Sequence, residues 1–184
     1  MGEVPFDSRE TFVFPSVLRS DMKLPFGEMI SFFDGVNGWR NGPQGVTEMP
    51  DRMKPILRAQ IFRNTLNLLR AEGELTVQFE KREKVGEKEA DVILISKEGE
   101  SVRLFIEPAS GTLLKKTYRA VGMGGPADFE ETYSDYREVS GLMIPFRLQS
   151  TQNGAAFLTG TISEVKFDTG VVAEELGKKP APGS

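Results

Sequence analysis

The side chains that could carry chemistry in this chain are few, because its 184 residues include neither histidine nor cysteine. Ser-His-Asp and Cys-His nucleophile systems therefore cannot be built. The common zinc sites, which need His or Cys, are excluded as well. Carboxylates, Lys, Tyr and Ser remain as candidate catalytic groups. We therefore predict a protein that is not an enzyme and that uses no cofactor and no metal.

Two groups of carboxylates are candidates for an acid/base pair or for a site that binds a hard cation. Glu87, Glu89 and Asp91 alternate along the chain and so share one face of a strand, and Glu130 and Glu131 are adjacent. A glycosidase pair needs two carboxylates that face each other across a cleft, and the sequence gives no sign of one. Since carboxylates commonly occupy the solvated face of a sheet, a carboxylate-based hydrolase is the least favoured function.

Phosphate and nucleic-acid binding are also poorly supported. Gly122-Met123-Gly124-Gly125-Pro126 is similar to a phosphate-binding loop, but Pro126 and an acidic strand follow it where a helix is needed. We predict a hairpin loop there. Arg52, Arg63 and Arg70 share one face of a predicted helix, which is typical of a solvated surface. The net charge of -4 argues against nucleic acid as a partner.

The composition gives more support to an apolar binding site, because the sequence contains 13 Phe and 7 Met. These residue types form adaptable apolar walls. The alternative is a filled hydrophobic core, since protein interiors are close-packed. Trp39, the only tryptophan, lies in a Gly-rich stretch and is either a ligand contact or a cover for the sheet end. The residues that we predict to line an apolar cavity are Phe12, Phe14, Met22, Met29, Phe32, Phe33, Trp39, Phe62, Leu66 and Leu69.

Hydrophobic periodicity predicts the elements that position these residues. Strands are expected over Glu10–Phe14, Leu18–Leu24 and Gly27–Phe33, and the last has apolar residues on both faces, which indicates burial on both. Asn37–Pro50 is rich in Gly, Pro and Asn and predicts a long loop. A helix is expected from Lys54 to Glu72. Its apolar residues form two stripes, one of Pro55, Ala59, Phe62, Leu66 and Leu69 and the other of Leu57, Ile61 and Leu68.

The second half predicts an antiparallel meander of short strands with tight turns, of which Asn153-Gly154 is the strongest hairpin signal. We predict a flexible terminus over 1–8, a single domain over 9–176 and a disordered tail over 177–184. The sequence contains no run of about 18 apolar residues, so it predicts no transmembrane helix. Its first residues are not those of a signal peptide. The strands are expected over Leu75–Phe79, Val92–Ile95, Val102–Ile106, Leu113–Tyr118, Phe129–Tyr136, Ile144–Gln149 and Phe157–Phe167.

Four segments resemble those of bacterial lipoprotein carriers of the LolA/LolB type. Phe14–Leu18 and Asp34–Trp39 resemble the Pro-started strand and the Asp-Gly turn before a Trp. Asp135–Pro145 resembles a hairpin in which a Tyr-containing strand turns at Gly and returns through Ile-Pro, and Glu107–Leu113 resembles the preceding turn. The resemblance covers about residues 9–168. It implies an α+β fold: a curved antiparallel sheet, half-barrel in shape, with one main helix on its concave face. Phe14 stands where the carriers place an Arg.

The resemblance implies non-catalytic binding of a lipid, an acyl chain or a hydrophobic segment of a partner protein, in the periplasm or cell envelope. The chain is also similar to domains appended to insulinase-type zinc proteases. The alternative that follows is a purely structural accessory domain of a larger envelope protein, with such a protease as parent or partner.

Overall fold

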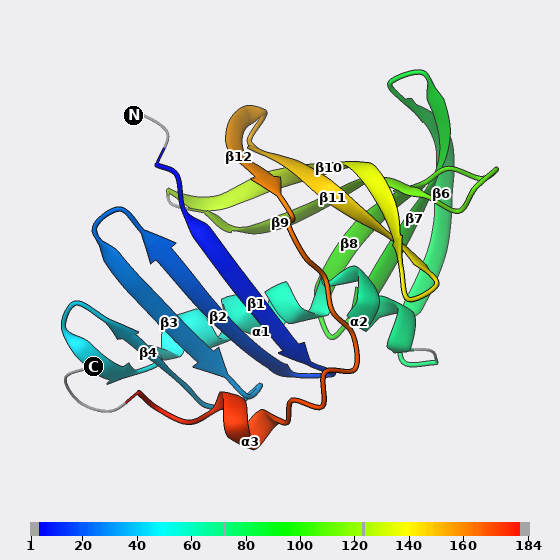
Figure 1. Ribbon diagram of the computed structural model, residues 1–184. Helices are drawn as coiled ribbons and strands as arrows, with labels where there is room; N and C mark the ends of the chain where they lie inside the picture. The colour runs from blue at the N-terminus through cyan, green and yellow to red at the C-terminus, as the bar shows by residue number, and fades with distance from the viewer. Residues whose placement is uncertain (1–3, 72, 123, 181–184) are drawn as a thin grey trace. The chain divides into compact units, whose positions relative to one another are not determined.

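The computed structural model describes residues 4–71, 73–122 and 124–180 (Figure 1). They form two compact units, one of Met1–Arg70 with Asp168–Ser184 and the other of Ala71–Phe167. The first unit contains a five-stranded sheet and the second a seven-stranded sheet, and all of their strand pairs are antiparallel. Over the described residues neither sheet closes on itself. The predicted α+β class, an antiparallel sheet with a helix packed on it, is confirmed, and the strands form two sheets where the sequence predicts one.

The five-stranded sheet follows the order of the sequence. Its third strand lies where the sequence predicts it, and its last two residues are buried on opposite faces: Phe33 packs with Leu18, and Phe32 with Val17. Burial on both faces is thus confirmed. We call the side of Leu18 and Phe33 the near face and the side of Val17 and Phe32 the far face. The strands are β1 (Asp7–Val13), β2 (Val17–Leu24), β3 (Gly27–Phe33), β4 (Gly38–Gly42) and β5 (Gly45–Glu48).

The predicted loop over Asn37–Pro50 is wrong, since β4 and β5 form a hairpin there. The turn-forming residues lie at the ends of these strands, and Trp39 and Val46 point to the far face. Gly38 is needed at the start of β4, because a Cβ there would lie 2.4 Å from the carbonyl oxygen of Phe32. The glycines therefore mark a tight turn and a close backbone approach, not the absence of a strand.

The predicted helix over Lys54–Glu72 is two helices, α1 (Lys54–Phe62) and α2 (Thr65–Arg70), preceded by a 3-10 turn, η1 (Asp51–Met53). The break comes at Asn64, whose side-chain oxygen accepts a hydrogen bond from the Leu66 amide at 3.0 Å. This is the contact of a helix N-cap, for which Asn is among the preferred residues. Leu57 and Ile61, from one predicted apolar stripe, pack against the near face of the sheet.

The seven-stranded sheet is a meander in sequence order from β6 to β12. Asn153 and Gly154 both have positive φ and form the predicted tight turn between β11 and β12. The predicted strand over Phe157–Phe167 ends earlier, at Thr161. The strands are β6 (Thr76–Val85), β7 (Lys88–Lys97), β8 (Glu100–Ile106), β9 (Leu113–Gly122), β10 (Gly125–Val139), β11 (Leu142–Gln152) and β12 (Ala155–Thr161).

The chain then returns to the first unit as α3 (Ala173–Leu176), a short helix that the sequence does not predict. Ala173 and Leu176 pack on the far face. Gly177 and Lys179, in the predicted disordered tail, make polar contacts with Trp39 and Glu48, whereas residues 181–184 lie outside the described ones. Within the described ranges, no helix has the length and apolar character needed to cross a membrane. The predicted single domain over 9–176 stays a prediction.

Candidate functional site

The strand register brings apolar side chains together on one face of the seven-stranded sheet. Val77 pairs with Ile95, Ile95 with Val102 and Leu104 with Lys116. Lys116 in turn pairs with Glu131 and Glu131 with Ser150. Since paired residues point to the same side, this fixes one continuous face, which we call the apolar face. Its apolar residues are Val77, Phe79, Ile93, Ile95, Val102, Leu104, Phe129, Phe146, Leu148, Phe157 and Leu158.

The apolar face is buried along its middle strands and exposed at its two edge strands. Val102 and Leu104 are buried, whereas Val77 on β6 is 62% exposed and Phe79 57%. On β12, Phe157 is exposed and packs edge-on against the ring of Phe129. Edge strands with exposed apolar side chains are a liability in a protein that does not use them, so these residues mark a candidate binding surface.

Four polar side chains lie in the middle of the apolar face, and we call them the charged cluster: Lys116, Tyr118, Glu131 and Tyr133. The ammonium of Lys116 lies 3.0 Å from the Glu131 carboxylate. The hydroxyls of Tyr118 and Tyr133 both donate to that carboxylate. Lys116 is buried, and its ammonium lies 5.6 Å from the centre of the Tyr118 ring. The cluster carries no net charge while both tyrosines are protonated.

The surroundings set the ionisation of the charged cluster. Burial pushes the pKa of Glu131 upward, but the charge of Lys116 and the hydrogen bonds from the two tyrosines outweigh it, so this pKa lies below its ordinary value. Burial, with the neighbouring Glu131 charge, raises the pKa of Tyr133 far above its ordinary value. Glu131 is therefore ionised and Tyr133 protonated at neutral pH. The Glu131 carboxylate is already engaged, which leaves it poorly placed to act as a general base.

A second ion pair, between Lys115 and Glu130, can be compared with the charged cluster, because each residue is the sequence neighbour of a cluster residue. Its ammonium and carboxylate lie 3.2 Å apart on the same two strands, but on the opposite face. Adjacent Glu130 and Glu131 thus point away from each other and cannot form a catalytic pair. Asp91 from the other candidate group is bound to Arg82 at 2.6 Å. Among the described residues, no three carboxylates cluster as a metal site would require.

Hollows on the surface of the described residues include one in each unit. The larger, of about 450 Å³, belongs to the second unit and is lined by residues of β6, β7, β9 and β10, among them Val85, Leu114, Tyr133 and Tyr136. Its volume is within the range of small-molecule sites, but Val85 and Leu114 pack with Val92 on the face opposite to the apolar face, so this hollow is not part of the candidate surface. The smaller, of about 120 Å³, lies at the β2–β3 hairpin beside Met22 and Ile30.

The structure distributes the predicted cavity residues over several places. Phe12 and Phe33 pack on the near face with α1, and Phe14 stacks on Phe12 with ring centres 5.5 Å apart. Met22 and Met29 are cross-strand neighbours farther along that face. These residues are brought together, although Phe33 is only 1% exposed and belongs to a packed cluster.

The other predicted cavity residues do not join that group. Phe32 and Trp39 point to the far face, so they cannot line one cavity with Phe33. Phe62, at the end of α1, and Leu66, in α2, are partly buried and are not members of the cluster that Leu57 and Ile61 form with the near face. Leu69 is exposed. Ligand binding by any of these residues stays a prediction.

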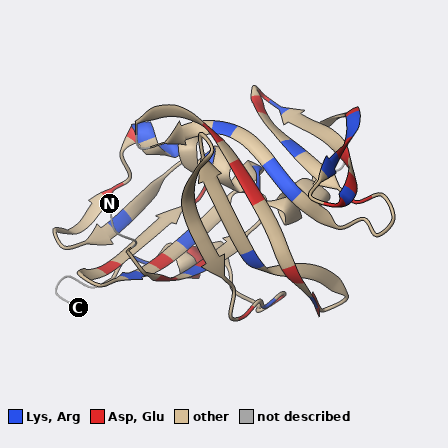
Figure 2. Ribbon diagram, turned by 90° about the horizontal axis from the view of Figure 1, so that it is seen from above, with Lys and Arg blue, Asp and Glu red and all other residues tan. Residues whose placement is uncertain are grey.

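Of the three arginines, Arg52 and Arg70 are exposed as predicted, but Arg63 is buried. The prediction of a solvated face fails for Arg63 because α1 ends just before it, and the helical wheel no longer applies. Figure 2 shows basic and acidic residues interspersed along the strands, without a broad basic face. The Gly122–Pro126 stretch joins β9 to β10 as a hairpin turn, and its residue 123 lies outside the described residues.

Comparison with known proteins gives the fold. Neither a family model nor a curated protein matches the sequence. A solved domain from Vibrio parahaemolyticus, described as an outer membrane lipoprotein-sorting protein domain, is similar with a TM-score of 0.59 and 13% identity, over 94% of this chain and 81% of that one. A LolA superfamily protein from Nitrosomonas europaea has a TM-score of 0.49 and 10% identity, over 96% and 89%. The chain shares the fold of the Vibrio domain, in agreement with the lipoprotein-carrier-like fold that the sequence predicts. Neither structure supports the predicted insulinase link.

Proposed function

We propose that this protein binds an apolar ligand on the apolar face of its seven-stranded sheet, without catalysis, in the bacterial cell envelope. The ligand class is a lipid, an acyl chain or a hydrophobic segment of a partner protein. The observation that carries the proposal is the exposure of Val77, Phe79 and Phe157 at the edges of a face that is otherwise buried. The description of the similar Vibrio domain as a lipoprotein-sorting protein supports the ligand class.

The driving force is the removal of apolar surface from water, at about 25 cal/mol for each Å². An acyl chain laid against Val77 and Phe79 covers side chains that are more than half exposed. The charged cluster adds no unpaired charge that the chain would have to desolvate, because Lys116 and Glu131 neutralise each other. The face is therefore suited to reversible burial of a chain and offers no group arranged to attack it.

Two valines of one sheet give a matched test. Val77 is 62% exposed on the apolar face, and Val121 is 58% exposed on the opposite face. We expect Val77→Glu to weaken binding of a fluorescent acyl probe by about tenfold or more, because a carboxylate must then be desolvated against the ligand. Val121→Glu should leave binding unchanged. Equal effects of the two substitutions, or no binding by the unchanged protein, would contradict the proposal.

The second candidate function is a structural accessory domain. It is favoured by the tight packing of both faces of the five-stranded sheet, where Phe33 and Trp39 are almost fully buried. The same titration separates the two candidates, because a scaffold with a filled core binds no probe at any concentration at which the probe stays monomeric.

A further inference from the structure

The far face of the five-stranded sheet carries its own apolar surface, which we call the groove, and the end of the chain covers it. The groove is formed by Val17, Phe32 and Trp39, with Val13, Ile30 and Val46 at its margin. Ala173 and Leu176, three residues apart on α3, point into it, and Leu176 is buried there. The backbone of Gly177 lies directly over the Phe32 ring, where an added Cβ would come within 3.1 Å of Cζ.

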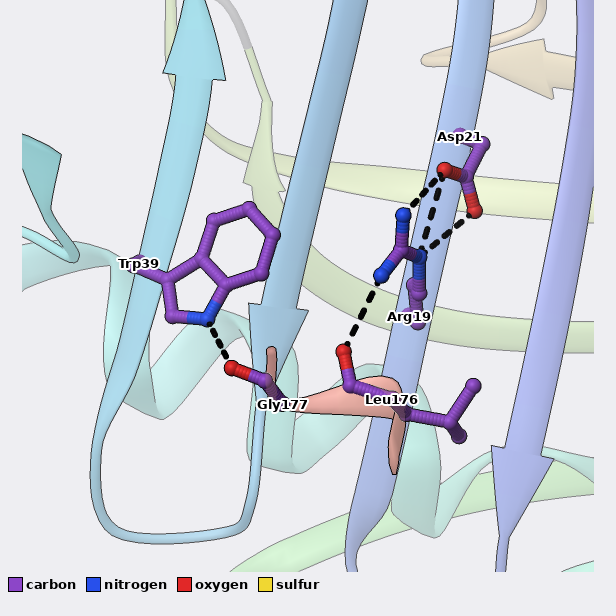
Figure 3. A network of polar contacts seen from close by, with 5 residues as sticks. All are labelled: Arg19, Asp21, Trp39, Leu176 and Gly177. Carbon is purple, nitrogen blue, oxygen red and sulfur yellow. Dashed lines mark hydrogen bonds and ion pairs between the residues drawn. The ribbon is translucent and has the colours of Figure 1, made fainter. Parts of the chain in front are cut away.

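Two side chains of the sheet hold the end of this helix by its carbonyl groups (Figure 3). Trp39 Nε1 donates to the carbonyl oxygen of Gly177 at 2.9 Å, and Arg19 Nη1 donates to that of Leu176 at 3.1 Å. Asp21 orients the Arg19 guanidinium through contacts of 2.8 and 2.9 Å. These carbonyls at the helix end have no partner within the helix. Arg19 and Trp39 therefore cap the C-terminal end of α3. They bind main-chain atoms of the segment that lies in the groove, and not its side chains.

A third contact adds charge complementarity at the margin of the groove. The Lys179 ammonium lies 2.6 Å from the Glu48 carboxylate. Both side chains are largely exposed, so this pair contributes little to affinity and mainly favours a basic residue at that position. The occupant is thus specified by two apolar residues three apart, a glycine directly after the second and a lysine two residues after the glycine.

We propose that the far face is a peptide-binding site whose resident ligand is the C-terminal segment 172–179. Residues 162–172 have no regular secondary structure and connect the segment to β12. The site binds two carbonyl groups and two apolar side chains that are three residues apart. A separate peptide of the same sequence presents the same groups. The tether serves only to raise the effective concentration of the segment. The site is independent of the apolar face in the other unit, so its failure would leave the proposed function untouched.

Trp39 reports on this site directly, because it is the only tryptophan. In the full chain, Leu176→Asp should release the segment and shift Trp39 emission to the red, as its indole becomes hydrated. A synthetic peptide of residues 170–180 should then reverse the shift in a saturable manner. A peptide with the same Leu176→Asp change should not reverse it, and Leu69→Asp, at an exposed position, should leave the emission unchanged.

A second measurement removes the dependence on that variant. A nitroxide-labelled peptide of residues 170–180, added to the unchanged full chain, should quench Trp39 by displacing the resident segment, while a labelled peptide with Leu176→Asp should not. The proposal is overturned if Leu176→Asp keeps the native emission. It is equally overturned if the shifted emission is not reversed and the labelled peptide does not quench Trp39 at millimolar concentration.

Discussion

The apolar face of the seven-stranded sheet and the far face of the five-stranded sheet treat their polar groups differently. On the apolar face, Lys116 and Glu131 of the same sheet satisfy each other, with two tyrosines. On the far face, Arg19 and Trp39 donate to carbonyls supplied by the end of the chain. The polar side chains of the apolar face are thus satisfied within the sheet, whereas those of the far face also bind a segment from the other end of the sequence.

The largest effect that tests this comparison concerns the charged cluster. Glu131→Gln removes the carboxylate that is paired with the buried Lys116 charge, and such losses cost about 3 kcal/mol of unfolding free energy. Glu130→Gln removes the partner of Lys115 on the opposite face, where Glu130 is about half exposed, and should cost less than about 1 kcal/mol. Urea unfolding of the two variants measures both values. Similar losses would show that the cluster is an ordinary surface network.

The pH dependence of stability tests whether the ionised Glu131 carboxylate is the source of this stabilisation. Because the pKa of Glu131 is lower in the folded protein than its ordinary value of 4.5, its contribution to stability is complete above that value. It is lost as the pH falls through the lower folded pKa. Glu131→Gln lacks this contribution at every pH, so the stability gap to the unchanged protein should narrow below pH 4.5. Unfolding curves from neutral to acid pH test this, and a constant gap would exclude the ionised carboxylate as its source.

A smaller effect is expected on the far face. Trp39→Phe keeps an aromatic ring beside Phe32 but removes the N–H that donates to Gly177, so the loss should be about 1 kcal/mol. The change should also increase hydrogen exchange at residues 173–177 and leave that of β9 and β10 unaltered. Exchange measured by mass spectrometry separates the two units. Unchanged exchange at α3 would mean that the indole does not hold the segment.

Local patterns predict the elements better than they predict the site. The short apolar run that ends before Asp34-Gly35 gives the limits of Gly27–Phe33, and Asn153-Gly154 gives the turn between β11 and β12. The break at Asn64 was within reach of the sequence, since Asn-Thr is a helix-start signal inside the predicted helix. The apolar residues of the first unit were found, but their assignment to one cavity failed for Phe32 and Trp39, because alternation in β3 and β4 sends them to the far face.

The charged cluster and the groove depend on pairing between distant segments. Lys116-Thr-Tyr118 and Glu131-Thr-Tyr133 each place a charged residue two positions before a tyrosine, which predicts a shared face within each strand. Only the register of β9 with β10 shows that the two faces are the same. Likewise, Leu176 follows two glutamates in a polar sequence, and its burial depends on a sheet more than a hundred residues earlier in the chain.

The central claim, that the apolar face binds an apolar chain, is tested most directly by locating a bound chain. A spin-labelled acyl chain added to the methyl-labelled full-length protein should broaden the methyl signals of Val77, Ile93 and Ile95. It should leave those of Val92 and Val121, on the opposite face, sharp. Broadening that is equal on both faces, or that is confined to the methyls of Met22 and Met29 in the other unit, would contradict the account.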